Sequence, residues 1–512
     1  MSPASVPRPA IAAPVALAEL SALVGGGLTA GADVGVTGVT HDSSAVRPGD
    51  LFAGLPGVRT HGARFADRAA AAGAVAILTD AAGSEEVKAT ASPALPAIVV
   101  ADPRAVLGTL SARVYGDPSA SLKVIGITGT NGKTTTAYLV EAGLRAAGHR
   151  TALLGTVETR IGDERLRSVR TTPEAPDLQA LLALARERGV TAVVMEVSSH
   201  ALALDRVAGV RFAVGAFTNL GIDHLDFHPT LEDYFQAKAR LFDGRSATAV
   251  VNSDDEAGRR LVGPDTVTVS AAGDPGARWR VVGRGPDGFE QEFTVLGPDG
   301  VERPARIGMP GRYSVENAVL ALAILDAAEV PVTTAIDAVA TAGLVPGRME
   351  RVPAPAGGPQ GIVDYAHDPG SVAAALAALR PVTAGRLICV LGCGGDRDAG
   401  KRPLMGEAAA RGADLLVATD DNPRSEPPAA IRAAMLAGVG RVPAEERAEV
   451  IEVADRRAAI AAAVERAGKG DCVAVLGKGH EQGQEVAGVV HPFDDREVLA
   501  EVLNTLLRGA RA

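Results

Sequence analysis

The stretch Gly126–Thr136, which reads GITGTNGKTTT, carries the clearest chemistry in the sequence. A β-branched run leads into a glycine-rich turn, and Lys133-Thr134 then opens a helical pattern, although Ile127 stands where the usual motif has its first glycine. Such a turn lets backbone N–H groups surround a phosphate, while a lysine neutralises its charge and a threonine hydroxyl can hold Mg²⁺. The residues that we expect to bind nucleotide phosphates are Gly129, Thr130, Asn131, Gly132, Lys133, Thr134 and Thr135.

A carboxylate follows a second apolar run. The segment AVVMEVSSH places Glu196 at the end of a predicted strand. A glutamate at a strand end is on its own more typical of a solvated position. Beside a phosphate loop, however, a carboxylate at the carboxyl end of a neighbouring strand can ligate the Mg²⁺ that accompanies the nucleotide. We therefore predict that Glu196 and Thr134 are metal ligands.

The elements that must position these groups follow from short apolar runs that alternate with alanine-rich helical segments. Such runs are typical of buried parallel strands. Residues 265–310 are instead rich in Gly, Pro and Val with little helical period, which indicates a small antiparallel insertion. The predicted strands are Gly73–Asp80, Ala97–Ala101, Lys123–Thr128, Ala192–Val197, Ala213–Thr218, Leu387–Leu391, Leu415–Thr419 and Cys472–Leu476.

These runs predict an α/β fold with three consecutive α/β domains. The length of 512 residues fits about three domains of ordinary size. Asp102-Pro103 and Pro346-Gly347 are the plausible boundaries, because both pairs favour turns. We therefore predict domains at residues 1–103, 104–345 and 346–512.

Composition excludes several classes of protein. The formal charge of −10 argues against a chain that coats nucleic acid or an anionic membrane, and 3% aromatic residues argue against base stacking. No apolar run approaches the roughly 20 residues of a membrane span, and no basic region precedes the N-terminal apolar stretch as in a secretory signal. We expect a cytoplasmic protein without membrane insertion, whose cysteines Cys389, Cys393 and Cys472 are reduced and buried.

A series of further motifs occurs in a fixed order. After GTNGKTT come EVSSH at 196–200, TNLGIDHLDFH at 218–228, the lysine of YFQAKARLF, GRYSVENAVLAL at 311–322, PGRMERV at 346–352, DYAHDP at 364–369 and GCGGDRDAGKRPLMG at 392–406. The series resembles the Mur ligases, the ATP-dependent amino-acid ligases of peptidoglycan precursor synthesis, over nearly the whole chain. The resemblance implies an N-terminal UDP-sugar domain, a central P-loop-type ATPase domain and a C-terminal Rossmann-like domain that brings the amino acid.

The resemblance also implies ligands and roles for individual residues. ATP and Mg²⁺ would be the cofactors, the other substrates would be small molecules, and we expect a monomer. Lys238 would be carbamylated, because a free ammonium would repel Mg²⁺ whereas a carbamate offers an oxygen ligand. The implied sets are Lys133, Glu196, His224 and Lys238 for catalysis; Thr134, Glu196, His224 and Lys238 for metal; Asn317, Arg348 and Asp364 for ATP beside the loop; and Ser43, Thr60, Thr171, Thr172, Ser198 and Arg206 for the UDP-linked dipeptide.

One C-terminal motif narrows the expected amino acid. The run Asp421-Asn422-Pro423-Arg424 resembles the DNPR signature of the family member that adds diaminopimelate to UDP-MurNAc-L-Ala-D-Glu. An arginine fork can bind the second carboxylate of diaminopimelate bidentately, whereas lysine would leave the fork unpaired. Family positions that complete this pocket are Arg397, Gly477 and Glu481.

Alternatives remain open at this point. A lysine-adding enzyme, or one that adds another diamino acid, is disfavoured by Arg424. The sister ligases that add D-Ala-D-Ala or act on folylpolyglutamate would lack DNPR and the HDSS…GDLF segment near the N-terminus. A nucleotide switch that ligates nothing is the most different alternative, and it needs no amino-acid pocket.

Overall fold

The computed structural model describes residues 6–10, 13–90, 95–166 and 170–509. The chain divides into two compact units that interleave along the sequence. The first comprises residues 1–128, 147–216 and 237–249, and the second comprises residues 129–146, 217–236 and 250–512. No helix within the described ranges is long and apolar enough to cross a membrane.

The N-terminal part of the first unit is a five-stranded sheet in the order β2-β7-β6-β5-β4, parallel except for β2. Asp102 caps the last helix of this part, because its carboxylate accepts the N–H groups of Arg104 and Ala105 while Pro103 opens the first turn. The elements are β1 (Val15–Ala16), α1 (Leu17–Leu23), β2 (Gly27–Leu28), β3 (Gly35–Val36), β4 (Gly38–Thr40), β5 (Asp50–Ala53), α2 (Ala66–Ala71), β6 (Ala76–Thr79), α3 (Ala81–Thr90), β7 (Ala97–Val99) and α4 (Pro103–Val114).

A second sheet has eleven strands in the order β11-β10-β9-β12-β8-β13-β14-β15-β16-β17-β18, and its part from β11 to β13 belongs to the first unit. Strands β9, β12 and β8 are parallel, and their interior positions are fully buried, as continuous apolar runs require. The elements are β8 (Lys123–Thr128), β9 (Thr151–Leu154), β10 (Thr159–Ile161), β11 (Glu164–Leu166), α6 (Ala175–Glu187), β12 (Ala192–Glu196), α7 (Ser199–Ala203), β13 (Phe212–Phe217), α8 (Leu231–Ala239) and β14 (Ser246–Asn252).

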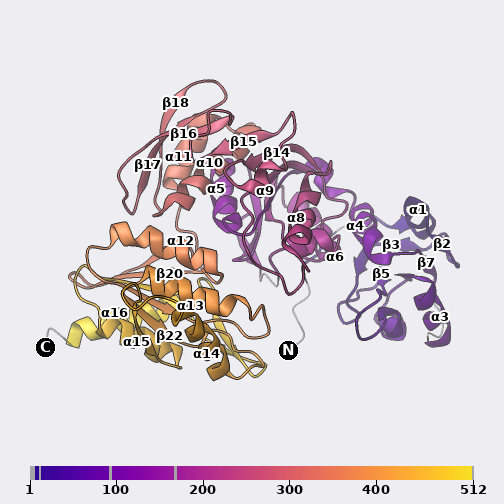
Figure 1. Cartoon of the computed structure of the whole chain (residues 1–512). Helices are drawn as coiled ribbons and strands as arrows, with labels where there is room; N and C mark the ends of the chain where they lie inside the picture. The colour runs from indigo at the N-terminus through magenta and orange to yellow at the C-terminus, as the bar shows by residue number, and fades with distance from the viewer. Residues whose placement is uncertain (1–5, 11–12, 91–94, 167–169, 510–512) are drawn as a thin grey trace. The chain divides into compact units, whose positions relative to one another are not determined.

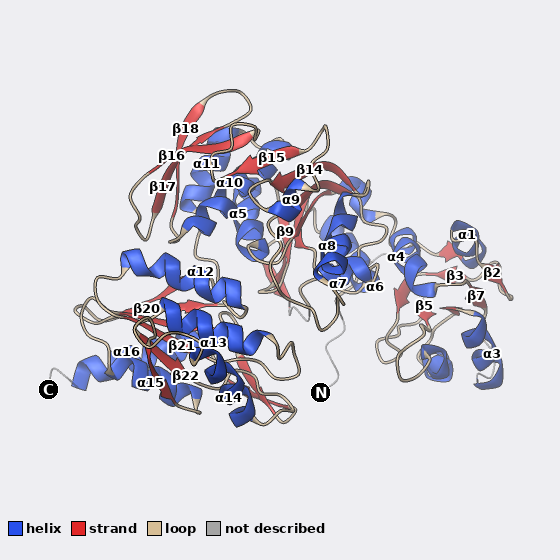
Figure 2. Cartoon of the chain, in the orientation of Figure 1, coloured by secondary structure: helices blue, strands red, loops and turns tan. Residues whose placement is uncertain are grey.

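In the second unit, helix α5 follows the glycine-rich turn and packs against α10 and α11. Strand β14 pairs in parallel with β15, and β16, β17 and β18 form an antiparallel meander (Figure 2). This meander confirms the small antiparallel insertion expected between 265 and 310. The elements are α5 (Lys133–Ala146), α9 (Glu256–Arg259), β15 (Val267–Ser270), β16 (Trp279–Arg284), β17 (Gln291–Leu296), β18 (Glu302–Ile307), α10 (Arg312–Ala327) and α11 (Val332–Thr341).

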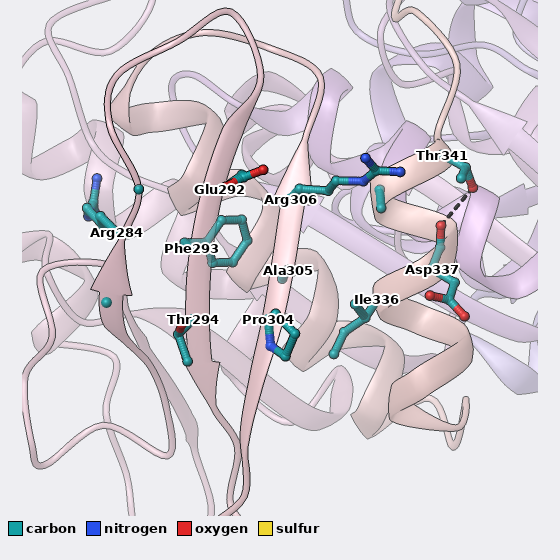
Figure 3. Close-up of a pocket in the computed structure, with 13 residues that line it drawn as sticks. Arg284, Glu292, Phe293, Thr294, Pro304, Ala305, Arg306, Ile336, Asp337 and Thr341 are labelled. Carbon is teal, nitrogen blue, oxygen red and sulfur yellow. Dashed lines mark hydrogen bonds between the residues drawn. The ribbon is translucent and has the colours of Figure 1, made fainter.

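A pocket of about 640 Å³ lies on this meander beside α11 (Figure 3). Phe293, Ala305 and Ile336 supply apolar surface, and charged side chains such as Arg306 and Asp337 stand around them. None of the residues that line it belongs to the sites predicted from the sequence.

The C-terminal part of the second unit is a six-stranded sheet in the order β19-β20-β24-β21-β22-β23. All strands from β20 to β23 are parallel, with α12, α13 and α14 on one face and α15 and α16 on the other (Figure 1). The elements are β19 (Glu350–Val352), β20 (Gln360–Asp364), α12 (Pro369–Leu379), β21 (Leu387–Leu391), α13 (Lys401–Gly412), β22 (Leu415–Ala418), α14 (Pro428–Val439), β23 (Glu449–Glu452), α15 (Arg456–Glu465), β24 (Cys472–Leu476), β25 (Gly483–Val486), β26 (Val489–Pro492) and α16 (Asp495–Gly509).

This doubly wound arrangement brings several loops together. The carboxyl ends of β20, β21, β22 and β24 share one edge, where open parallel sheets bind their ligands. The three cysteines are free and buried, as expected, and burial raises the pKa of each thiol to about 12. The loops that follow the four strands carry the C-terminal motifs singled out in the sequence.

Candidate active site

The phosphate loop needs glycine at two positions. Gly129 and Gly132 have φ values of 144° and 84°, in the region that favours glycine. A Cβ on Gly132 would also collide with the side-chain oxygen of Asn317, and one on Gly129 with the hydroxyl of Thr218. The loop is therefore packed tightly on both sides.

Lys133 folds back over its own loop. Its Nζ donates hydrogen bonds to the carbonyls of Gly129, at 3.0 Å, and Thr130, at 2.7 Å. An ammonium held there carries its charge at the mouth of the turn, where a phosphate would need it. Next to it, Arg348 donates from Nη2 to Oγ1 of Thr134 at 3.1 Å, so the predicted nucleotide-binding residues meet at the start of α5.

Asn219 holds the loop from outside and was not singled out in the sequence. Its backbone carbonyl accepts the N–H of Thr130 at 2.8 Å, and its Oδ1 accepts the N–H of Asn131 at 3.0 Å. Thr218 adds a hydrogen bond from its hydroxyl to the carbonyl of Asn131 at 2.6 Å. Because these two amides are already satisfied, a phosphate would rely on the amides at the N-terminus of α5.

The predicted base and ribose contacts lie next to this loop. Asn317 is buried and accepts a hydrogen bond from the Thr136 hydroxyl at 3.4 Å. Asp364 accepts the N–H groups of Met349, at 2.7 Å, and Ala366, at 2.8 Å. Burial raises the pKa of the Asp364 carboxyl, and the positive charge of Arg348 only partly opposes that effect. Two fixed backbone donors thus set the orientation of this carboxyl group.

Asp223 is the centre of a charge cluster that sequence reasoning missed. Its carboxylate lies 3.6 Å from Nε2 of His224, 3.8 Å from Nε2 of His367 and 3.5 Å from Nζ of Lys401. Burial alone would raise the pKa of Asp223, but the positive charges of His224, His367 and Lys401 lower it well below its ordinary value. His224, a predicted metal ligand, therefore stands beside an ionised carboxylate, and its backbone has a φ of +58°.

Glu196 in the first unit is buried, and its carboxylate is fully oriented. Oε1 accepts the N–H of Thr156 at 2.8 Å, and Oε2 accepts the Thr156 hydroxyl at 3.0 Å. Thr156 lies two residues after the end of β9, which neighbours β12, so the two strand ends meet. Because only this pairing gives Thr156 its role, the sequence contained no signal for it.

Three residues predicted to bind the UDP-linked dipeptide surround Glu196. The Thr172 hydroxyl donates to the Glu196 carbonyl at 2.8 Å and accepts the N–H of Ser198 at 3.0 Å. The Thr171 hydroxyl lies 3.0 Å from that of Thr156. The structure thus brings together a group of hydroxyls around one buried carboxylate.

Arg206 pairs with a residue that sequence reasoning also missed. Its Nη2 lies 2.8 Å from Oε1 of Glu174, which also faces Arg104 at 3.6 Å and Arg170 at 3.9 Å. Burial lowers the pKa of Arg206, although Glu174 opposes this effect. Three arginines around a single carboxylate leave a surplus of positive charge that suits an anionic ligand.

The other residues predicted to bind the UDP-linked dipeptide or the metal lie apart from these groups in the sequence. Ser43 is half-buried in the loop after β4, and Thr60 is exposed. Lys238 is buried in α8, and its grouping with Thr134, Glu196 and His224 stays a prediction. Among the described residues, no three His, Cys, Asp or Glu side chains cluster as metal ligands.

The predicted amino-acid pocket lies at the carboxyl edge of the C-terminal sheet. Asn422 donates from Nδ2 to Oε2 of Glu481 at 2.8 Å, which links the loops after β22 and β24. Gly477 has a φ of 114°, and a Cβ there would lie 2.6 Å from Oδ2 of Asp421. Pro423 is buried beside these residues, whereas Arg397 is exposed in the loop after β21.

Arg424 is fixed by both its backbone and its side chain. Nη1 donates to the carbonyl of Gly395 at 2.6 Å, and Nε lies 3.3 Å from Oε2 of Glu485. Its N–H donates to the carbonyl of Glu485 at 3.0 Å, and its own carbonyl accepts the N–H of Ala487 at 2.7 Å. With a φ of +51°, the residue adopts a strained conformation that these contacts maintain. Such strained residues are often found at functional sites.

Comparisons with known proteins match this architecture along the chain. Three family models match: "Mur ligase family, catalytic domain" at residues 35–115, "Mur ligase middle domain" at 127–325 and "Mur ligase, glutamate ligase domain" at 347–479. Proteins of Streptomyces coelicolor and Streptomyces avermitilis are 56% and 55% identical, each over 97% of this chain and 98% of their own length. Both are named UDP-N-acetylmuramoyl-L-alanyl-D-glutamate--2,6-diaminopimelate ligase. A solved structure with that name is 31% identical with a TM-score of 0.67, covering 96% of this chain and 99% of the other.

Proposed function

The chain belongs to the Mur ligase family, and we infer that it is the ADP-forming ligase that adds diaminopimelate to UDP-MurNAc-L-Ala-D-Glu in peptidoglycan precursor synthesis. The recognised family and the three-domain α/β architecture are both confirmed. The observation that carries the choice of amino acid is Arg424, which is held at the carboxyl edge of the C-terminal sheet by Gly395 and Glu485. We propose domain boundaries at residues 1–103, 104–345 and 346–512.

The first chemical step is phosphoryl transfer. The γ-carboxylate of the D-glutamate attacks the γ-phosphorus of ATP, the bond to the β-phosphate oxygen breaks, and an acyl phosphate and ADP form. Alignment and charge neutralisation dominate such a step. We assign phosphate binding to the loop Gly129–Thr135, with Lys133 supplying the positive charge that its contacts hold at the mouth of the loop. Asn317, Arg348 and Asp364 would bind the rest of ATP.

We propose that Mg²⁺ assists this step by neutralising phosphate charge. The residues that would hold it are Thr134, Glu196, His224 and carbamylated Lys238. Their chemistry fits, because Glu196 presents a buried and oriented carboxylate and a carbamate would add hard oxygen atoms. Lys238 is buried, so a carbamate formed there would need a cation such as Mg²⁺ beside it to offset the cost of burying its charge.

The second step forms the amide. The amine of diaminopimelate attacks the acyl-phosphate carbon, phosphate leaves, and a proton of the amine passes to solvent. We propose that Arg424 binds the carboxylate at the far end of diaminopimelate, while Asp421 and Glu481 bind the ammonium beside it. Asn422, Pro423, Gly477 and Arg397 complete this pocket.

The other substrate would bind in the first unit. We propose that Ser43, Thr60, Thr171, Thr172, Ser198 and Arg206 contact the UDP-linked dipeptide. The surplus of positive charge around Glu174 supports this for Arg206, since the dipeptide substrate carries several negative charges. We further propose that the enzyme acts in the cytoplasm as a monomer on small molecules and engages neither nucleic acid nor membrane.

Amino-acid-dependent phosphate release from ATP tests the proposal. With UDP-MurNAc-L-Ala-D-Glu present, meso- and LL-diaminopimelate are compared with L-lysine for the wild type, Arg424→Ala and Arg424→Lys. We expect the wild type to turn over a diaminopimelate but little L-lysine. In both variants kcat/KM for diaminopimelate should fall about 100-fold or more, because neither an alanine nor a lysine side chain at position 424 can form the bidentate pair with a carboxylate.

Arg411→Ala is the matched control, because Arg411 is an exposed arginine of the same sheet's helices, paired with Glu407 and Glu446. It should keep wild-type kinetics. Equal turnover with lysine would remove the role of Arg424 but leave a Mur ligase. Failure of every amino acid to stimulate phosphate release would instead favour a nucleotide switch.

A further inference from the structure

Lys478 is a fully buried lysine within the loop that follows β24, and the mechanism above does not use it. Its side chain is 0% exposed. Nζ donates to Oδ1 of Asn422 at 2.9 Å and to Oε2 of Glu481 at 3.0 Å, and it lies 4.0 Å from Oδ1 of Asp421. An ammonium is buried in this way only where such partners offset its lost hydration.

The lysine fixes which way the Asn422 amide faces. Oδ1 of Asn422 accepts hydrogen bonds from Lys478 Nζ and from the N–H of Glu485, the latter at 3.0 Å. Both donors require the amide oxygen on that side, so Nδ2 must point to Glu481, which it reaches at 2.8 Å. Without the ammonium, the backbone N–H of Glu485 would be the only one of these two donors left.

The same ammonium also donates a hydrogen bond to the Glu481 carboxylate. Oε2 of Glu481 accepts from both Lys478 and Asn422, so this oxygen of the carboxylate is held in place. The Glu481 side chain is 31% exposed whereas that of Lys478 is 0% exposed. A substrate can therefore touch Glu481 but not Lys478, which must act through its neighbours.

We propose that Lys478 is a positioning residue that orients Asn422 and Glu481 and sets the pocket's charge to match the far end of diaminopimelate. This inference rests on the proposed function. The Lys478 ammonium lies 3.0 Å from Oε2 of Glu481 and 4.0 Å from Oδ1 of Asp421, so it offsets part of the negative charge of these two carboxylates. The far end of diaminopimelate bears one ammonium and one carboxylate, whereas the far end of lysine bears an ammonium alone.

Charge matching makes Lys478 a determinant of selectivity. Without it, Asp421 and Glu481 would lose a positive charge that lies 4.0 Å and 3.0 Å from them, and the pocket would become more negative by one charge. A negative pocket favours the far end of lysine, which is an ammonium alone. The loss should therefore fall on diaminopimelate more than on lysine.

The test compares Lys478→Met, Lys478→Gln and the wild type in the full-length enzyme. Lys478→Met keeps the length of the side chain without charge, and Lys478→Gln keeps a donor for Asn422 without charge. The readouts are kcat and KM for diaminopimelate, lysine, ATP and UDP-MurNAc-L-Ala-D-Glu, together with thermal unfolding. Lys469→Met, at an exposed lysine just before β24, is the matched control.

For Lys478→Met we expect KM for diaminopimelate to rise about 30-fold or more, since an oriented charged contact is lost. KM for ATP should stay within about twofold, because Lys478 donates to Asn422 and Glu481, neither of which is assigned to ATP. The ratio of kcat/KM for diaminopimelate to that for lysine should fall about tenfold in both variants. Lys469→Met should change none of these values.

A uniform change in all KM values, or an unchanged ratio of diaminopimelate to lysine, would overturn the proposal. If Lys478→Met does not fold, Lys478→Gln decides, because it lacks the charge but retains a hydrogen-bond donor. The wild-type measurement separates the two claims. Wild-type enzyme that does not use diaminopimelate contradicts the proposed function, whereas a wild type that uses it beside variants of unchanged selectivity contradicts only the role of Lys478.

Discussion

The phosphate loop and the amino-acid pocket are built by different means. Lys133 reaches carbonyls only 3 and 4 residues away, and the loop is one continuous stretch of chain. In the amino-acid pocket, Asn422 bonds Glu481 across 59 residues, and Arg424 bonds Gly395 across 29 residues. The groups of the loop thus come from one continuous stretch that Thr218 and Asn219 support from outside, whereas the pocket is assembled entirely by a parallel sheet that brings strand ends together.

The two regions also differ in how they use buried charge. The loop relies on helix-end amides and one half-buried lysine, but the pocket rests on a fully buried ion pair. Arg456 forms a pair with Asp495 at 2.7 Å, and neither side chain is exposed. Arg456 also donates to the carbonyls of Leu476, at 3.0 Å, and Asp420, at 3.3 Å. Those carbonyls belong to the residues just before the two pocket loops, so the buried pair supports the edge of the sheet.

The largest effect should come from breaking that pair. Arg456→Met leaves the Asp495 carboxylate buried and unpaired, which costs about 3–5 kcal/mol of unfolding free energy. Urea unfolding measures the loss, and hydrogen exchange should place it in β22, β24 and α16. In contrast, the amides of α5 should keep their protection.

The double variant Arg456→Met with Asp495→Leu is the control. Because it removes both charges, it should recover much of the lost stability, as buried ion pairs replaced by apolar residues often do. Equal loss of protection in α5 would show that the two regions are not independent, and would contradict the comparison.

The same contrast explains what could be predicted from the sequence. The strands Lys123–Thr128, Leu387–Leu391 and Cys472–Leu476 were predicted with their observed bounds, because each is a short apolar run with clear breaks. The other predicted strands were also present, but most were shorter than expected, such as Ala76–Thr79 within Gly73–Asp80. Strand ends are set by hydrogen-bonding partners, which the local pattern does not contain.

Residues that act through distant partners could not be predicted. Thr156, Glu174, Asp223 and Lys478 are ordinary polar residues until the fold brings their partners from other segments. Asp223, for example, acquires its lowered pKa from three positive groups, two of which come from segments more than 140 residues away. The phosphate loop was predictable because its glycines, Lys133 and Thr134 form one continuous motif, although Asn219, which also holds it, comes from a distant segment and was missed.

Two glycine substitutions test the same comparison, and we expect effects of intermediate size from them. Gly132→Ala and Gly477→Ala each place a Cβ at a positive φ and against a side-chain oxygen, of Asn317 and Asp421 respectively. Each should cost about 1–3 kcal/mol locally, or roughly 10- to 100-fold in KM. We expect Gly132→Ala to raise KM for ATP alone, and Gly477→Ala to raise KM for diaminopimelate alone.

Steady-state kinetics with each substrate varied in turn measures both effects. Gly148→Ala is a suitable control, because that glycine also has a positive φ, of +88°, but has open space around it. It should leave every KM near the wild-type value. If either substitution raised both KM values equally, a change in one region would affect ligand binding in the other, which contradicts the comparison.

The smallest effect concerns the thiols beneath the amino-acid pocket. Cys389 lies in β21 and Cys393 in the loop that follows it, and burial raises the pKa of each thiol from 9.0 to about 12. A folded-state pKa above the unfolded value means that the unfolded chain loses its thiol protons first as pH rises. The stability linked to these thiols is therefore fully present below pH 9 and is lost as pH rises towards 12.

Iodoacetamide at pH 8.5 should label both cysteines quickly in urea but slowly in the native protein, as read by mass spectrometry. The phosphate loop contains no cysteine, so this labelling reports on the amino-acid pocket alone. Rapid labelling of Cys393 in the native protein would show that the loop after β21 opens to solvent, and would contradict tight packing around the pocket.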